Sequence, residues 1–203
     1  MRVLGIDPGL TRCGWGVVDG RPGQRPTAVG VGVVRSDADL AIELRLLELH
    51  TAVTALVREH QPDVVAIERV FHQNNKGTAT GTAQAAGVAA LAAAQASRPV
   101  AWHTPSEVKA AISGNGRADK EQVTIMVTRV LGLTEAPRPA DAADALALAV
   151  CHVWRGPTQD RLRVAALASG AGVGQVVEKL STAPRPAVRQ SRWQGIGSGG
   201  VYR

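Results

Sequence analysis

The sequence predicts an α/β domain followed by a basic appendage. Stretches rich in Val and Ile alternate with Ala- and Leu-rich stretches of helical spacing, and this alternation is typical of helices packed on a sheet. The 203 residues suit one domain plus an appendage, and a hydrophobic content of 45% is enough to bury a full core.

Three strands are expected before the first helix. Residues 2–7 form an apolar run that ends in an acid and is followed by a Pro8-Gly9 turn. Residues 14–19 and 28–35 are predicted as two further strands, so an antiparallel meander opens the domain. The spacing of leucines and valines then predicts a helix over residues 40–59.

A second strand that ends in an acid follows at residues 63–68. Its unbroken apolar run fits a central strand covered on both faces. A polar loop over residues 69–76 leads to a helix of small residues at 77–97 and to a strand at 99–103. We interpret His103, at the end of that strand, as structural.

Three helices complete the domain. The pattern Thr-Pro-Ser-Glu at residues 104–107 is typical of a helix start, and this helix ends near Gly114. The next helix covers residues 119–131, and the last runs from residue 140 to about 154.

We assign residues 1–156 to the folded domain and residues 157–203 to a largely disordered tail, because the tail is rich in Pro, Gly, Ser and Arg. The charge excess of +6 lies at this end: residues 155–203 contain 8 Lys and Arg against 2 acidic residues, whereas residues 1–154 contain 15 of each. Such a tail suits contact with nucleic acid, and a solvated tail that only aids solubility explains the charge equally well.

The composition argues against an exported or membrane protein. Cys13 and Cys151 are the only cysteines and form neither a disulfide framework nor a zinc-spacing pattern. The chain opens with a strand rather than a signal peptide, and no stretch of about 18 uncharged apolar residues has the character of a membrane helix. We expect a cytoplasmic location.

Four carboxylates predict the chemistry: Asp7, Glu68, Asp141 and Asp144. Each stands where an apolar run meets a polar turn or where a helix begins, and few cationic side chains flank them in sequence. Asp7 and Glu68 each stand at the end of a strand, and in open α/β sheets ligands bind at the carboxyl ends of the strands. Asp141 and Asp144 lie three residues apart on one helix face. Carboxylates in such places cost free energy unless they are paired or bind a cation, so we predict a site for Mg²⁺ or Mn²⁺.

Each acid also has a simpler explanation. Asp7 before Pro-Gly suits a turn, and Asp141 suits a helix N-terminus. Glu68 at a strand end and Asp144 before an Ala/Leu run are harder to explain in this way. Together the four favour a clamp in which two divalent ions, roughly 3.5–4 Å apart, promote in-line displacement at phosphorus by activating water and stabilising the leaving oxygen.

Further residues are candidates for contact with nucleic acid. Phe71 lies in the polar loop after Glu68, where its ring could stack on a base or wedge between base pairs, or instead fold back on the sheet edge. Arg69 and Lys76 border this loop, and we include both as DNA contacts. Lys109 and Lys120 lie near the starts of two helices, where they could hold phosphates or simply be solvated.

The motifs resemble those of the RuvC Holliday-junction resolvases over residues 1 to about 154. The matching segments occur in order: Gly5-Ile6-Asp7-Pro8-Gly9 with Arg12, Gly14 and Gly16, Ala66-Ile67-Glu68-Arg69-Val70-Phe71, Gly81-Thr82-Ala83-Gln84, His103-Thr104-Pro105-Ser106-Glu107-Val108-Lys109, and Ala140-Asp141-Ala142-Ala143-Asp144-Ala145-Leu146-Ala147.

The resemblance implies an RNase H-like fold with a mixed five-stranded sheet flanked by helices. It also implies a homodimer that nicks two opposing strands of a four-way junction in recombination and repair, with two Mg²⁺ ions per site once substrate is bound. By position, Asp7, Glu68, Asp141 and Asp144 would hold the metal, and Phe71, Lys109 and Lys120 would contact DNA. The RuvA and RuvB branch-migration proteins would be partners. Aspartate at 144 is one of two family patterns, the other being histidine.

A two-fold symmetric junction suits two equivalent sites on one axis. The small residues of the helix at 77–97 would permit close approach of a second copy, or equally close packing on the chain's own sheet.

Three other functions compete with this interpretation. An RNase H-type nuclease could use the same acids on an RNA–DNA hybrid. An actin-like phosphotransferase shares the Gly-x-Asp-x-Gly turn but needs two repeated subdomains and has no place for Asp141 and Asp144. A non-catalytic junction-binding protein would gain nothing from four carboxylates near a polyanion.

Overall fold

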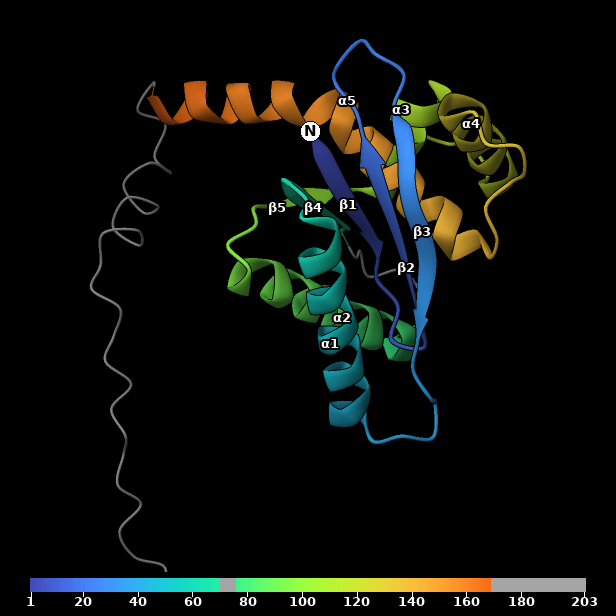
Figure 1. Ribbon diagram of the computed structural model, residues 1–203, viewed down its shortest axis with the longest axis vertical. Coiled ribbons are helices and arrows are strands. Elements are labelled where there is room, and N and C mark those ends of the chain that lie inside the picture. The colour runs from blue at the N-terminus through green and yellow to red at the C-terminus, as the bar shows by residue number, and fades with distance from the viewer. Residues whose placement is uncertain (70–75, 169–203) are drawn as a thin grey trace, which may run out of the picture. The chain divides into compact units, whose positions relative to one another are not determined.

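The computed structural model describes residues 1–69 and 76–168, and its first compact unit spans Met1–Arg161 (Figure 1). The strands of this unit are β1 (Arg2–Asp7), β2 (Arg12–Asp19), β3 (Thr27–Arg35), β4 (Val64–Glu68) and β5 (Val100–His103). The helices are α1 (Ile42–His60), α2 (Lys76–Gln95), α3 (Pro105–Ser113), α4 (Lys120–Leu131) and α5 (Ala140–Ala168).

The strands form one mixed sheet in the order β3-β2-β1-β4-β5. The first three strands pair antiparallel, as the predicted meander requires, and β4 and β5 add in parallel to β1. The pairing of Ile6 with Ile67 brings the acidic ends of β1 and β4 side by side. The five-stranded mixed sheet expected from the resemblance is therefore confirmed.

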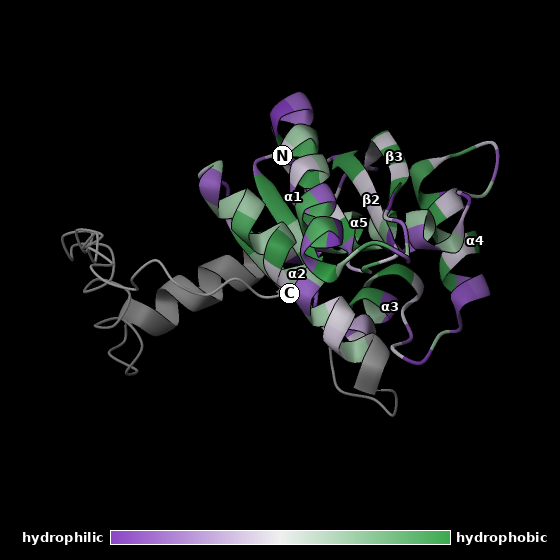
Figure 2. Ribbon diagram, turned by 90° about the horizontal axis from the view of Figure 1, so that it is seen from below, coloured by the Kyte–Doolittle hydropathy of each residue, from purple (hydrophilic) through white to green (hydrophobic). Residues whose placement is uncertain are grey.

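Helices cover both faces of the sheet (Figure 1). On one face Leu4 and Ile6 of β1 pack with the buried residues of α1 and α2. On the other face the neighbouring Val3 packs with α3, α4 and α5, because successive strand residues point to opposite faces. Figure 2 shows green, hydrophobic residues running through the strands and their flanking helices. β4 is a central strand buried on both sides, as predicted.

Glycines bring α5 unusually close to the sheet. A Cβ atom built on Gly5 would collide with the α5 backbone at Ala145, and one on Gly14 would collide with the carbonyl of Asp141. At Gly16 the same atom would lie 2.9 Å from the backbone nitrogen of Leu146. Only residues without a side chain allow this approach, and it fixes the first turns of α5 beside the ends of β1 and β2.

The start of α3 follows the predicted cap, and α4 has a cap of the same kind. Thr104 and Glu107 form a capping box at α3, and Asp119 and Gln122 form another at α4. Both helices end at a glycine in the left-handed conformation, as expected for Gly114.

The predicted end of the last helix is wrong. α5 continues beyond Trp154 through Gly156 and Pro157 to Ala168. A proline removes one backbone donor and crowds the preceding turn, at about 3 kcal/mol, but it does not oblige a helix to end. The predicted disordered segment lies mainly at residues 169–203, outside the described residues. The boundary at residue 156 stays a prediction.

Two further findings concern the predicted class of protein. Cys13 and Cys151 are buried free thiols, so no disulfide joins them. Among the described residues, no helix combines the length and apolar character needed to cross a membrane.

Candidate active site

Asp7 and Glu68 end two adjacent parallel strands, β1 and β4. Both carboxylates are half-buried, at the strand ends where the sequence predicted a ligand site. Asp141 and Asp144 lie in the first turns of α5, which the glycines of β1 and β2 hold against the same region. Their side chains are 17% and 21% exposed. The structure therefore gathers the four predicted acids, although the first and last of them lie 137 residues apart in the sequence.

Cationic partners for two of the acids come from other elements. Arg12 Nε lies 3.0 Å from Asp141 Oδ2, and Lys120 Nζ lies 3.2 Å from Asp144 Oδ2. The expectation that few cations flank the acids holds along the sequence but is wrong in space. The β1–β2 turn brings Arg12 to α5, and the start of α4 brings Lys120 there.

Three of the acids line one cavity of about 200 Å³ together with two lysines. Its lining residues are Asp7, Glu68, Pro105, Val108, Lys109, Lys120, Val123 and Asp144. Lys109 and Lys120, predicted to hold phosphates, thus stand beside the carboxylates. The cavity presents both acidic oxygens and cationic donors to whatever enters it.

The nearby cations compensate the negative charge of the four acids only in part. Burial raises the pKa of Asp7 to about 8, and the charges of Glu68, Asp144 and Asp141 add to that rise. Burial, followed by the charge of Asp144, raises the pKa of Glu68 to about 7. Lys120 opposes both shifts, and its own pKa is raised chiefly by Asp144. The cluster would accept further positive charge.

The donor set fits a hard divalent cation in chemical type. All four side chains offer carboxylate oxygens, which Mg²⁺ and Mn²⁺ prefer. Asp141 Oδ2 is buried and accepts no hydrogen bond, although Arg12 lies near it. In the arrangement seen for the described residues, however, no three His, Cys, Asp or Glu side chains converge closely enough to hold one ion.

The other predicted contacts have different outcomes. Arg69 is exposed directly after β4, and its backbone N–H donates to the His103 carbonyl at 2.7 Å. Phe71 lies outside the described residues, and Lys76 begins α2 with a side chain that is not among those described. His103 is buried and its Nε2 lies 3.0 Å from Nδ1 of His152, as suits a structural residue.

Comparison with known proteins identifies a family. The family model described as "Crossover junction endodeoxyribonuclease RuvC" matches residues 3–152. A protein of that name from Saccharopolyspora erythraea is 57% identical over 203 residues, covering all of both chains. Another from Salinispora arenicola is 63% identical over 175 residues, covering 86% of this chain and all of the relative.

Solved structures show the same fold. Thermus thermophilus RuvC in complex with Holliday junction substrate superposes with a TM-score of 0.74 at 36% identity, covering 78% of this chain and 96% of that one. The yeast mitochondrial Holliday junction resolvase shares the fold at a TM-score of 0.55 and 13% identity, covering 74% of this chain and 78% of that one. The fold is thus of the RuvC and RNase H-like type, and the chain belongs to the RuvC family of crossover junction endodeoxyribonucleases.

Proposed function

We propose that this chain resolves four-way DNA junctions by paired symmetric nicks, with Asp7, Glu68, Asp141 and Asp144 as ligands of divalent metal ions. The observation that carries the proposal is the gathering of four carboxylates at the ends of β1 and β4, where burial and mutual charge raise the pKa of Asp7 and Glu68. Family membership supports the reaction, and the structure with a Holliday junction belongs to a relative 36% identical.

Bound Mg²⁺ would supply the activated water and would stabilise the leaving oxygen. The chain's own contribution is to hold oxygen ligands on rigid elements. Asp7 and Glu68 are fixed by strand pairing, and Asp141 and Asp144 by the close seating of α5. With a pKa of about 8, Asp7 is mostly protonated at neutral pH, and Glu68, with a pKa of about 7, is protonated in part of the molecules. An entering cation would displace these protons.

The lysines of the cavity would position DNA rather than react. Lys109 and Lys120 line the space in front of the acids and can hold phosphate oxygens. We retain Phe71, Arg69 and Lys76 as further DNA contacts, with Phe71 as the residue that stacks at the junction. Contacts of this kind to shape and backbone would give selectivity for a branched structure.

A homodimer and the RuvA and RuvB branch-migration proteins are part of the same proposal. Two equivalent sites on a two-fold axis suit the symmetry of the junction. A DNA substrate also agrees with the predicted cytoplasmic location.

The test is cleavage of a synthetic mobile four-way junction, with RNA–DNA hybrid and linear duplex as competitors. Paired nicks in the junction with Mg²⁺ would support the proposal. Preference for the hybrid would favour an RNase H-type nuclease, and tight junction binding without cleavage in Mg²⁺ or Mn²⁺ would favour a non-catalytic binding protein.

A further inference from the structure

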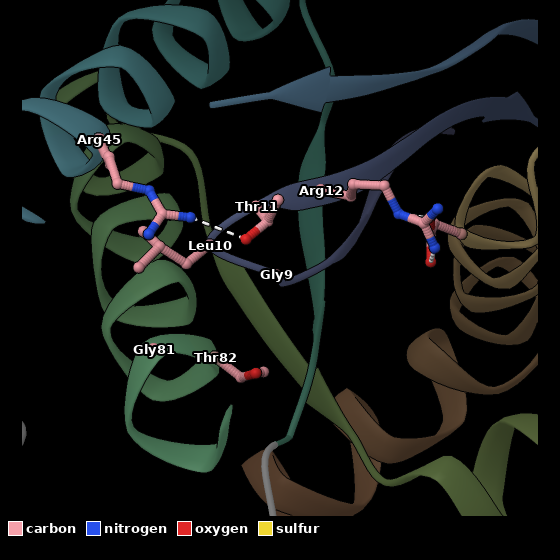
Figure 3. Close-up of a pocket in the computed structure, with 8 residues that line it drawn as sticks. Gly9, Leu10, Thr11, Arg12, Arg45, Gly81 and Thr82 are labelled. Atoms are coloured by element: carbon pink, nitrogen blue, oxygen red, sulfur yellow. Dashed lines mark hydrogen bonds and ion pairs between the residues drawn. The ribbon is translucent and has the colours of Figure 1, made fainter. Parts of the chain in front are cut away.

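A second pocket borders one of the carboxylates, Asp141, and neither Lys109 nor Lys120 lines it. It has a volume of about 630 Å³ and lies between the β1–β2 turn, α1 and α2 (Figure 3). Its lining residues are Gly9, Leu10, Thr11, Arg12, Arg45, Gly81, Thr82 and Asp141. We call it the arginine pocket. Asp141 lines this pocket, whereas the other three acids line the smaller cavity, so the two spaces adjoin the same cluster.

Arg45 is held in a defined position in the arginine pocket. Its Nη2 donates to Thr11 Oγ1 at 2.7 Å, and its Nε donates to Ser36 Oγ at 3.1 Å. Ser36 Oγ in turn donates to the Leu10 carbonyl at 2.5 Å. Figure 3 shows Arg45 reaching from α1 toward Thr11, while Arg12 extends to the other side of the turn. The guanidinium is therefore oriented by the turn that follows Asp7.

The charge of Arg45 is left without a counter-charge. Both partners named above are neutral hydroxyls, and within the described part of the chain no carboxylate forms an ion pair with Arg45. A guanidinium has five N–H donors, so donors remain for a ligand. A half-buried arginine whose fork is oriented but not neutralised is suited to bidentate binding of an oxyanion.

We propose that the arginine pocket binds a backbone phosphate of the DNA strand that crosses the carboxylates, separately from the phosphates held by Lys109 and Lys120. The inference rests on the proposed function. Each strand of a DNA duplex carries one phosphate charge per about 3.4 Å of the helix axis. When the phosphate to be cleaved lies at the acids, the next phosphates of that strand therefore lie on either side of the acids. The lysine-lined cavity would hold one of these phosphates, and Arg45 with Arg12 another. Such contacts fix the register of the strand and read no sequence.

The experiment measures junction binding in EDTA, which prevents cleavage, for wild type, Arg45→Ala, Arg45→Lys and Arg58→Ala. Arg58 is exposed on the same helix and serves as the matched control for lost charge. We expect Arg45→Ala to weaken binding by about 10-fold and to reduce the salt slope by about 1, as for the loss of one phosphate contact. Arg45→Lys should keep most of the slope, and Arg58→Ala should match wild type.

A scan of single methylphosphonates along the junction strand tests for the phosphate itself. At one position, replacing the charged phosphate by a neutral methylphosphonate should weaken wild-type binding about as much as Arg45→Ala does. The same replacement should not weaken binding by the Arg45→Ala variant any further. The inference is overturned if no methylphosphonate position shows this dependence on Arg45, or if Arg45→Ala binds the junction as Arg58→Ala does. Arg45 would then only stabilise the turn through its hydrogen bonds. Wild-type nicking in Mg²⁺ is recorded in parallel, so a failure of the proposed function would appear separately, as absence of cleavage by wild type.

Discussion

Replacing Asp7 by asparagine should stabilise the metal-free protein, and the gain should grow with pH. In the unfolded chain Asp7 loses its proton near its ordinary pKa of 3.8, whereas in the folded protein its pKa is about 8. Between these values the folded state holds a proton that the unfolded state has released, so the stability that Asp7 confers at low pH is lost as pH rises through this window. Asparagine carries no charge at any of these pH values and removes the dependence.

The magnitude follows from the size of the shift. Each pKa unit corresponds to about 1.4 kcal/mol, so the cost attached to Asp7 grows by about 2–3 kcal/mol between pH 5 and pH 7. This is an upper figure, since Asp7 is half-buried and retains some solvent. For a chain of this size, such a change corresponds to a rise in Tm of about 4–12 °C for Asp7→Asn relative to wild type.

The assay is urea unfolding in EDTA at pH 5, 6, 7 and 8 for wild type, Asp7→Asn and Asp39→Asn. Asp39 is exposed and does not line the cavity, so it controls for loss of a surface charge. Adding Mg²⁺ should stabilise wild type more than Asp7→Asn, because the variant lacks one carboxylate ligand and would bind the cation more weakly. A gain from Asp7→Asn that is absent or equal at all pH values would refute the reasoning.

Three further predictions follow from the same geometry. Glu68→Gln should lower the nicking rate by about 100-fold or more while junction binding is unchanged, because loss of a metal ligand removes about 3 kcal/mol of transition-state stabilisation. A wild-type rate in single-turnover cleavage would show that Glu68 takes no part in the chemistry. Gly14→Ala should lower the free energy of unfolding in urea by about 1–3 kcal/mol and impair nicking, because the added Cβ meets the α5 backbone. The control is Gly87→Ala, whose Cβ meets nothing within 4 Å and which should be neutral or slightly stabilising. Equal effects of the two substitutions would contradict the close packing of α5 on the sheet. Lys120→Ala should reduce the salt slope of junction binding by about 1, and an unchanged slope would show that this lysine serves only its ion pair with Asp144.

The strand ends and the acids that stand on them were accessible from the sequence because they follow from local patterns. Apolar runs that end in an acid identified β1 and β4, and parallel pairing of two such strands puts Asp7 next to Glu68. The three-residue spacing of Asp141 and Asp144 put them on one face of α5. The mixed five-stranded sheet was expected from the family resemblance rather than from periodicity, and its strand order was not predicted.

The partners of the acids could not be predicted in the same way. Arg12 meets Asp141 across 129 positions, and Lys120 meets Asp144 across 24, so neither pairing leaves a local signal. The depth at which α5 docks depends on three glycines of β1 and β2, which sequence patterns show only as weak strand residues. Arg45 was missed for a related reason, since on α1 it looks like an ordinary charged surface residue until the turn folds over it.

The most direct test of the central claim is nicking of a synthetic mobile four-way junction by wild type and Asp7→Asn in Mg²⁺, with linear duplex as the control substrate. We predict paired symmetric nicks in the junction by wild type, little cutting of the duplex, and binding without cleavage by the variant. Cleavage by Asp7→Asn at the wild-type rate, or binding without cleavage by wild type in both Mg²⁺ and Mn²⁺, would contradict the assignment of these carboxylates to a metal-dependent nuclease site.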